Sequence, residues 1–402
     1  MSSKLSFRDL KIRGKNVLIR VDFNVPLNEN QDITDDTRIV AALPTIQHVL
    51  NNGGSAVIMS HLGRPKGKKV DSLSLLPCAR RLSKLLDCPV KMAPDCIGSD
   101  VEVMVQNLNA GEVMLLENLR FHNAEEHPDD DPEFVKNLAS LGDVYINDAF
   151  GTAHRAHAST TLVSQYFPGR AAAGFLLEKE ITMIGKSLLT PERPFYALIG
   201  GAKISTKIGV IKSLIKKVDG ILIGGGMSYT FLKAQGISIG DSIHEDDFLE
   251  TSRDIIEECS RENIDLALPI DLVIANEYSN DANSKIIDTK DGIPNGYQGM
   301  GIGPETVQKY SEILKNAKTI IWNGPVGVYE FSSFATSTID MAKTVAGLSA
   351  TTIIGGGDCV AAINAAGVAD KISHISTGGG AALEYIEFGT LPGIEALSQA
   401  TS

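Results

Sequence analysis

The chain is 402 residues long, with 43% hydrophobic and 21% charged residues, a balance typical of ordinary globular proteins. One core seldom grows to this length, so we expect about two or three domains, two being the simplest arrangement. The formal net charge of −12 argues against a nucleic-acid partner, which needs a broad basic surface, although a small anionic ligand remains possible at a locally basic site.

The five cysteines are odd in number and show no Cys-x-x-Cys spacing, so the sequence predicts neither a disulfide framework nor a zinc site. Free thiols suit a reducing compartment. Residues 1–15 lack the apolar segment of a secretion signal, and no run elsewhere reaches membrane-spanning length. We therefore expect a cytoplasmic protein without a targeting segment and without a membrane partner.

Short apolar, β-branched runs recur along the chain with helix-period segments between them, a pattern typical of parallel sheets covered on both faces. In the first half these runs are Val17–Phe23, Ser55–Met59, Val113–Leu116 and Val144–Ile146. In the second half they are Phe195–Ile199, Gly220–Ile223, Leu272–Ala275, Thr319–Trp322 and Thr352–Ile354. The predicted fold class is α/β, with two lobes that each hold a parallel sheet flanked by helices in a Rossmann-like three-layer arrangement.

The segment 174–189 has apolar residues at helical spacing between Pro168-Gly169 and Pro191. It is predicted to form a hinge helix that joins the lobes. The first lobe would then cover residues 1–173 and the second residues 190–390.

Open parallel sheets bind ligands at the carboxyl ends of their strands, so the residues after each run are the candidates for function. Most arginines lie at or before Arg170 and none follows Arg261, which makes the first lobe the arginine-rich one. Several converging guanidinium groups predict a polyanionic ligand, because each holds a phosphate or carboxylate with two hydrogen bonds. The candidates are Arg38, Arg64, Arg120 and Arg155. The alternative for each is a solvated surface charge.

Asp22 and Asn24 alternate with apolar neighbours at the end of the first run, so their side chains are expected on one face. They could orient a substrate hydroxyl group there. The alternative is turn chemistry before Pro26, since Asp and Asn commonly bond their own backbone.

Glycine clusters follow nearly every run of the second half. In 199–207, a glycine pair precedes Lys203 and Lys207, which would share one face of a following helix at a spacing of i, i+4. Glycines let a phosphate approach unpaired backbone amides, and a helix N-terminus attracts it. This pattern predicts a nucleotide-phosphate site, and the alternative is a tight turn with solvated lysines.

Asp358 follows the glycine triplet 355–357 at an expected helix start. Its carboxylate could hold the Mg²⁺ that accompanies nucleotide phosphates, because this cation prefers oxygen ligands. The alternative is helix N-capping, and both roles can coexist.

Taken in this order, the segments closely resemble the phosphoglycerate kinase family over essentially the whole chain. The most specific matches are Val17–Leu27, Asn147–Ser159, Trp322–Gly327 and Ser376–Ala381. The resemblance implies a monomer that transfers a phosphoryl group reversibly between 1,3-bisphosphoglycerate and ADP, giving 3-phosphoglycerate and ATP in glycolysis and gluconeogenesis. It also implies Mg²⁺ as the cofactor, and a C-terminal segment, 391–402, that packs back on the first lobe.

The resemblance further implies which residues bind each ligand. The phosphoglycerate would contact Asp22, Phe23, Asn24, Arg38, His61, Leu62, Gly63, Arg64, Arg120 and Arg155. The nucleotide would contact Gly201, Lys203, Lys207, Asn323, Glu330, Gly356, Gly357, Asp358 and Cys359, with Glu330 on the ribose and Asp358 on magnesium. Cys359 departs from the family pattern, in which Ser or Thr is expected, so a phosphate contact there would rely on the backbone amide.

A carboxylate acceptor is already ionised at neutral pH, so catalysis would need no general base. We expect Arg38, Lys203 and amides near Gly378 to stabilise the transferring phosphoryl group. The two lobes would line one cleft and close about the joining helix to align the reactants. The alternative function is a two-lobed anion-binding protein without catalysis.

Overall fold

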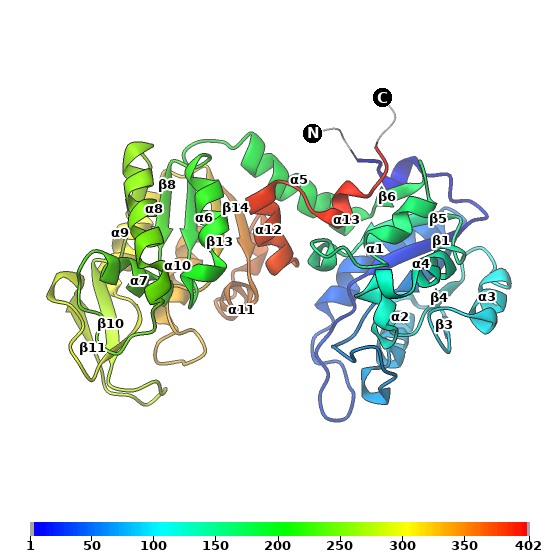
Figure 1. The fold of residues 1–402 in the computed structure, drawn as a ribbon, viewed down its shortest axis with the longest axis horizontal. Helices are drawn as coiled ribbons and strands as arrows, with labels where there is room; N and C mark the ends of the chain where they lie inside the picture. Colours follow the sequence, from blue (N-terminus) through cyan, green and yellow to red (C-terminus); the bar gives the residue numbers. More distant parts are fainter. Residues whose placement is uncertain (1–3, 400–402) are drawn as a thin grey trace. The chain divides into compact units, whose positions relative to one another are not determined.

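The computed structural model describes residues 4–399, which form two compact units (Figure 1). The first unit comprises the chain up to Thr182 together with the segment from Thr390 onward, and the second runs from Met183 to Gly389. The boundary falls within helix α5 (Phe175–Leu189), which covers the segment expected to join the lobes. The ends of the predicted first lobe, 1–3 and 400–402, lie outside the described residues.

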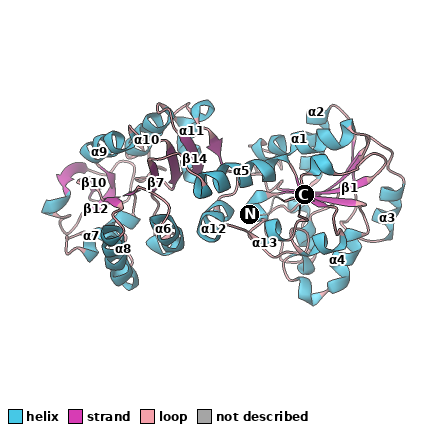
Figure 2. Ribbon diagram, turned by 90° about the horizontal axis from the view of Figure 1, so that it is seen from above, coloured by secondary structure: helices cyan, strands magenta, loops and turns pink. Residues whose placement is uncertain are grey.

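The first unit contains a parallel six-stranded sheet of order β3-β4-β2-β1-β5-β6. Its strands are β1 (Asn16–Val21), β2 (Ser55–Met59), β3 (Val90–Met92), β4 (Val113–Leu115), β5 (Val144–Asp148) and β6 (Ala171–Ala173). Helices α1 (Thr37–Asn51) and α2 (Leu76–Leu86) cover one face and α4 (Pro132–Ala139) the other, while α3 (Ser99–Gln106) lies near the β3 edge (Figure 2). Because both faces are covered, every residue of β2, β4 and β5 is buried.

The C-terminal segment belongs to this first unit. Helix α13 (Pro392–Glu395) follows Thr390, and the amide of Gly393 donates to the carbonyl of Ala153 at 2.8 Å. The amide of Ser398 donates to the carbonyl of Ala171 in β6 at 2.9 Å. Backbone hydrogen bonds therefore hold this segment beside β6.

The second unit contains another parallel six-stranded sheet, of order β15-β14-β13-β7-β8-β9. Its strands are β7 (Phe195–Ile199), β8 (Gly220–Ile223), β9 (Asp265–Ala267), β13 (Thr319–Asn323), β14 (Thr351–Gly355) and β15 (His374–Ile375). Helices α6 (Ile208–Ile215) and α12 (Gly380–Phe388) lie on one side, and α9 (Pro304–Leu314), α10 (Thr336–Ala346) and α11 (Gly357–Ala365) on the other (Figure 2). The prediction of two helix-covered parallel sheets is confirmed.

One predicted strand lies in a different sheet. The run Leu272–Ala275 belongs to β10 (Asp271–Ala275), which pairs antiparallel with β11 (Ser284–Asp288) and β12 (Gln298–Ile302) in a separate three-stranded sheet. Its assignment to a parallel sheet was therefore wrong. Its apolar run resembles that of a parallel strand because both faces of β10 are largely covered, whereas its partner β11 is mostly exposed. Helices α7 (Met227–Ala234) and α8 (Leu249–Arg261) complete this unit.

Proline marks the start of several helices. Pro77 in α2, Pro132 in α4 and Pro304 in α9 all lie in the first turn. An amide in the first turn has no partner within the helix, so a residue without an N–H group costs nothing there. These positions fix where each helix starts after its loop.

No helix among residues 4–399 is long and apolar enough to cross a membrane. All five cysteines are free thiols.

Asp148 links the end of β5 to the start of α5. Its Oδ1 accepts hydrogen bonds from the amides of Leu176 at 2.9 Å and Leu177 at 3.2 Å. Burial raises the pKa of Asp148 from 3.8 to about 7, although bonds from Thr45 and these amides favour the ionised form. The folded chain therefore keeps a proton on this carboxyl group across a range where the unfolded chain loses it.

Stability should consequently depend on pH through Asp148. Between about pH 4 and pH 7 the folded state binds more protons than the unfolded state, so the free energy of unfolding falls as pH rises. We expect Asp148→Asn to remove up to about 1.4 kcal/mol per pH unit of this slope. Urea unfolding of the native chain and the variant at several pH values measures it, with the exposed Asp129→Asn as control. If the free energy of unfolding changed with pH in the same way for Asp148→Asn and the native chain, the raised pKa of Asp148 would be contradicted.

Candidate functional site

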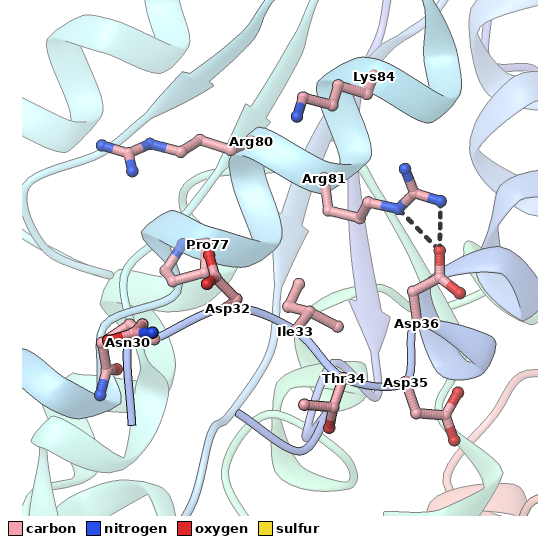
Figure 3. Close-up of a pocket in the computed structure, with 11 residues that line it drawn as sticks. Asn30, Asp32, Ile33, Thr34, Asp35, Asp36, Pro77, Arg80, Arg81 and Lys84 are labelled. Atoms are coloured by element: carbon pink, nitrogen blue, oxygen red, sulfur yellow. Dashed lines mark hydrogen bonds and ion pairs between the residues drawn. The ribbon is translucent and has the colours of Figure 1, made fainter. Parts of the chain in front are cut away.

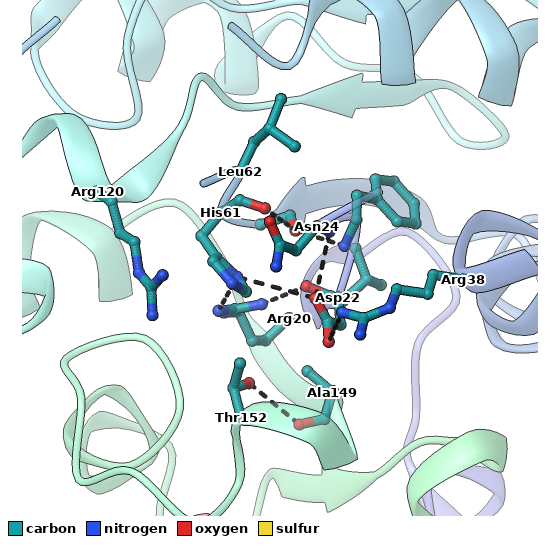
Figure 4. A network of polar contacts seen from close by, with 12 residues as sticks. Arg20, Asp22, Asn24, Arg38, His61, Leu62, Arg120, Ala149 and Thr152 are labelled. Carbon is teal, nitrogen blue, oxygen red and sulfur yellow. Dashed lines mark hydrogen bonds and ion pairs between the residues drawn. The ribbon is translucent and has the colours of Figure 1, made fainter. Parts of the chain in front are cut away.

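The carboxyl ends of β1, β2 and β4 bring most of the predicted first-lobe residues together (Figure 4). The segments after these strands are 22–24, 60–64 and 117–121. Parallel neighbours end at the same edge of a sheet, so side chains distant in sequence meet there. In the view of Figure 4, Arg38 and Arg120 flank the pair Asp22 and His61 from opposite sides.

Asp22 positions Arg38. The Arg38 Nη1 atom, near the start of α1, donates to Asp22 Oδ2 at 2.7 Å. Burial would raise the pKa of Asp22, but His61, Arg38 and Arg20 together keep it below its usual value, so the carboxylate stays charged. The Arg38 side chain remains 39% exposed. It can therefore still donate hydrogen bonds to an anion.

His61 is buried and neutral. Its Nδ1 lies 3.2 Å from Arg20 Nη2. A guanidinium group only donates, so Nδ1 accepts and the ring proton is on Nε2. Burial, reinforced by the charges of Arg20, Arg120 and Arg38, holds the pKa of His61 well below its ordinary value, despite the opposing effect of Asp22. His61 can therefore offer an N–H donor without a positive charge.

Arg20 is a member of this network that the sequence analysis missed. It lies within β1, is only 1% exposed, and donates from Nε to Ser159 Oγ at 2.8 Å. Ser159 in turn donates from Oγ to Glu125 Oε1 at 2.6 Å and from its amide to Glu125 Oε2 at 3.0 Å. The available signal was an arginine inside an otherwise apolar strand, because a charge buried there needs partners.

Two asparagines hold the loop after β2 in place. Asn24 Oδ1 accepts the amide of Gly63 at 2.9 Å, and Asn118 Oδ1 accepts the amide of Leu62 at 3.2 Å. Arg120 Nη1 donates to the carbonyl of Gly63 at 2.9 Å. The turn interpretation also applies to Asp22, since its Oδ1 accepts the backbone amide of Asn24 at 3.2 Å. Asn118 was not predicted from the sequence.

The remaining first-lobe candidates differ in accessibility. Phe23 is buried in the core, and its amide donates to Ser60 Oγ at 2.8 Å, while the side chain of Leu62 is also buried. Arg64 and Arg155 are exposed. Their side chains are therefore outside the hydrogen-bonded network that includes Asp22, Arg38 and His61.

In the second unit, a cavity of about 370 Å³ lies at the carboxyl ends of β7, β8 and β13. The predicted residues Gly201, Glu330 and Asp358 line it. The sequence analysis missed the others, which are Ala202, Gly225, Gly226, Tyr229, Ile243, Tyr278, Gln298, Gly299, Met300, Pro325, Gly327 and Val328. Its mixture of glycine, apolar and acidic residues is typical of a small-molecule site.

The glycine turns hold strand ends together. The amide of Gly200 donates to the carbonyl of Asn323 at 2.9 Å, and that of Gly201 to the carbonyl of Pro325 at 2.9 Å. Gly324 has φ +90°, and a Cβ there would lie 2.2 Å from the carbonyl oxygen of Gly200. The expectation that the amides of Gly200 and Gly201 are unpaired was therefore wrong, because the ends of β7 and β13 bond each other.

The two predicted lysines do not share a helix face. Lys203 is exposed and precedes a 3₁₀ turn (Ile204–Thr206), and α6 begins only after Lys207. Lys207 is buried, and its Nζ donates to Asn323 Oδ1. Burial lowers the pKa of Lys207 to about 8, against the attraction of Cys359 and Asp358. The i, i+4 interpretation failed because a 3₁₀ turn replaces the expected α-helical one.

Asp358 lies in the first turn of α11 with its side chain exposed. The N-cap of this helix is Gly356, which has φ +94° and precedes Gly357, so the capping alternative for Asp358 does not apply. An accessible carboxylate beside a cavity suits a hard cation such as Mg²⁺.

The Cys359 thiol and the Gly378 amide are both occupied by contacts within the protein. Cys359 is fully buried in the core of the second unit, and burial raises the pKa of its thiol. Only its backbone is left for a ligand. The amide of Gly378 donates to Ser376 Oγ at 3.1 Å, so contact with a phosphoryl group requires exchange of this bond.

Tyr278 positions Glu330. Its hydroxyl group donates to Glu330 Oε1, and its ring centroid lies 4.9 Å from that of Phe331. Burial and the neighbouring carboxylate raise the pKa of Tyr278 to about 12, so it remains a hydrogen-bond donor.

A larger cavity, of about 660 Å³, lies between residues 30–36 and α2 (Figure 3). Arg80, Arg81 and Lys84 line it together with acidic residues, and Arg81 pairs with Asp36 at 2.7 Å. None of the predicted site residues lines this cavity. Its acidic side chains offset its basic ones, so it is not the expected anion site.

Comparison with known proteins places the chain in a family. The model of the family "Phosphoglycerate kinase" matches residues 7–388. The phosphoglycerate kinase of Chlorobium limicola is 54% identical over 398 residues, covering 98% of this chain and 99% of that protein. The phosphoglycerate kinase of Moorella thermoacetica is 52% identical, covering 99% of this chain and 100% of that protein.

Solved structures agree with these matches. The phosphoglycerate kinase of Coxiella burnetii superposes with a TM-score of 0.87 at 39% identity, covering 98% of both chains. That of Pyrococcus horikoshii OT3 superposes with a TM-score of 0.84 at 32% identity, also covering 98% of both chains. The chain therefore belongs to the phosphoglycerate kinase family.

Proposed function

We propose that this chain transfers a phosphoryl group reversibly between 1,3-bisphosphoglycerate and ADP, giving 3-phosphoglycerate and ATP, and so acts in glycolysis and gluconeogenesis. It is a phosphotransferase with a carboxyl group as acceptor. The observation that carries this proposal is the cluster of Arg38, His61 and Arg120 with Asp22 and Asn24 at one sheet edge, since it combines cationic forks with neutral donors and acceptors.

In the first unit, we propose that the phosphate and carboxylate groups of phosphoglycerate bind Arg38, Arg120 and the neutral His61. Asp22 and Asn24 would orient its hydroxyl group. The exposed side chains of Arg64 and Arg155 can turn toward a bound phosphate, while Phe23, Leu62 and Gly63 shape the loop around it.

In the second unit, we propose that ATP or ADP occupies the cavity lined by Gly201, Glu330 and Asp358, with Glu330 on the ribose. Asp358 would hold the Mg²⁺ that accompanies the nucleotide, which would supply positive charge near the phosphates. The other phosphate contacts would come from Lys203, Lys207, Asn323, Gly356, Gly357 and the backbone of Cys359.

Catalysis would rest on positioning and charge neutralisation. The acceptor carboxylate is ionised at neutral pH and needs no base. Arg38 from the first unit, with Lys203 and the turn at Gly378 from the second, would stabilise the transferring phosphoryl group. Bound Mg²⁺ would neutralise phosphate charge.

The proposed ligand sites belong to separate units, so we propose that transfer takes place in a closed arrangement that aligns the reactants and excludes water. We propose that residues 174–189 act as the hinge. Small-angle scattering with and without both substrates checks this, and identical dimensions would contradict it.

We further propose that the chain acts as a cytoplasmic monomer, in keeping with five free thiols and a net charge of −12. An assay with 3-phosphoglycerate and MgATP, coupled to oxidation of a reduced nicotinamide cofactor, tests the function. Turnover is expected. Tight binding of both ligands without turnover would instead support an anion-binding protein.

Tyr278 should contribute to nucleotide affinity through Glu330. In Tyr278→Phe the ring remains but Glu330 loses a donor, so we expect the KM for ATP to rise about fivefold, equivalent to about 1 kcal/mol, with kcat unchanged. Steady-state kinetics measures the effect, and Tyr166→Phe in the first unit is the control. An unchanged KM in Tyr278→Phe would show that this hydrogen bond does not position Glu330.

A further inference from the structure

Asp95, Cys96 and His122 form a compact cluster outside the network described above. Asp95 and Cys96 lie just beyond β3, and His122 follows the 3₁₀ turn Leu119–Phe121 beyond β4. Because β3 and β4 are parallel neighbours, these two segments meet at the same sheet edge. The ligand-type atoms of the three side chains all lie within 4.8 Å of one another.

Asp95 is the centre of the cluster. Its Oδ1 lies 2.6 Å from His122 Nε2 and accepts the amide of Cys96 at 2.6 Å. The hydrogen bond from the Cys96 amide holds the Asp95 carboxylate close to the backbone of Cys96. The Asp95 oxygen and the Cys96 sulfur, from consecutive residues, therefore lie close together. The Cys96 thiol also donates to Asp95.

We propose that Asp95, Cys96 and His122 bind one Zn²⁺ ion through a carboxylate oxygen, a thiolate sulfur and an imidazole nitrogen, with water as the fourth ligand. This ligand set suits zinc, which takes O, N and S donors in tetrahedral geometry. Zinc bonds of about 2.0–2.3 Å place neighbouring ligand atoms about 3.3–3.6 Å apart, so side-chain shifts of about 1 Å suffice.

The surroundings of the cluster would also allow a metal ion to enter and bind. The side chains of Asp95 and His122 are 48% and 30% exposed, so an ion can enter from solvent, while the fully buried Cys96 closes the inner side. Zn²⁺ binding would release the Cys96 thiol proton to solvent and replace the hydrogen bond between Asp95 Oδ1 and His122 Nε2.

Cysteine spacing does not reveal this site, because only one ligand is a cysteine. Asp95 and His122 are far apart in the sequence, and only the pairing of β3 with β4 brings them together. The cluster contains none of the residues assigned to phosphoglycerate or nucleotide, so the inference does not depend on the proposed function.

Titration of the full chain with Co²⁺, followed by its absorption spectrum, tests the proposal. We expect one Co²⁺ per chain, a thiolate-to-cobalt charge-transfer band, and loss of this band on addition of Zn²⁺. Cys96→Ser should abolish the band. Cys88→Ser is the matched control, since it removes a more accessible thiol beside a carboxylate, Asp87, and should leave the band intact.

Two more variants keep the test decisive if Cys96→Ser does not fold. Asp95→Asn and His122→Gln change the partly exposed ligands, and each should weaken Co²⁺ binding at least about tenfold while far-ultraviolet circular dichroism stays native. The absence of a band in the native chain would overturn the proposal. So would a band that survives in Cys96→Ser, or Co²⁺ affinity that is unchanged in both other variants.

Discussion

Replacing Arg38 by alanine is expected to lower kcat about 10²–10³-fold while changing the KM for ATP less than about twofold, as for loss of one preorganised donor to a transition state. Asp22 holds this guanidinium group at 2.7 Å, and its half-exposed position leaves donors for an anion. Arg38 would meet the nucleotide only at the transferring phosphoryl group, where charge develops, so ground-state nucleotide binding should not change.

Steady-state kinetics in the ATP-consuming direction measures both constants for Arg38→Ala. The control is Arg80→Ala, which removes an exposed arginine of the same unit that lines the other cavity. Circular dichroism shows whether the fold is intact. Equal and small changes in kcat and KM would assign Arg38 to a surface salt bridge with Asp22.

Replacing Arg20 by methionine should destabilise the first unit by about 3–5 kcal/mol, the usual cost of removing one partner of a buried charged network. The variant removes the strongest positive charge acting on the buried Glu125 and leaves only the weaker effect of Arg120. Burial already raises the pKa of Glu125, while Arg20 and the bonds from Ser159 oppose that rise. Glu125 should therefore take up a proton in the variant.

Urea unfolding of Arg20→Met, with Arg13→Met as a surface control, measures the loss. The double variant Arg20→Met with Glu125→Gln should be more stable than Arg20→Met alone, because glutamine is neutral without the proton uptake that Glu125 needs. A loss below about 1 kcal/mol for Arg20→Met would mean that the two charged side chains are not energetically coupled.

The sequence determined the architecture and indicated several of the residues that gather at one edge of the first-unit sheet. Buried parallel strands are apolar throughout, so β2, β5, β7 and β13 could be read as runs. The ends of such runs indicated Asp22, Asn24 and Arg120 as candidates, whereas His61 was named only through the family resemblance. Four strands of two or three residues escaped detection, because so short a segment carries no periodicity; they are β3, β6, β9 and β15. The three-residue β4 was found because its apolar run continues through Leu116.

Only the tertiary structure decided which groups are charged, bonded or exposed. Sequence spacing treated Lys203 and Lys207 as equivalent, whereas packing against Asn323 buries only Lys207. It also led to the expectation of unpaired glycine amides after β7, whereas the amides of Gly200 and Gly201 donate to the carbonyls of Asn323 and Pro325.

Contacts formed only in the tertiary structure also explain why the sequence analysis did not identify the remaining residues. Arg20 meets Ser159, and Asp95 meets His122, through contacts between segments far apart in the chain. The local sequence pattern specifies where the apolar strands lie along the chain. The pairing of strands in the sheet brings these distant side chains together, and hydrogen bonding and burial then fix their protonation, which no short window of sequence contains.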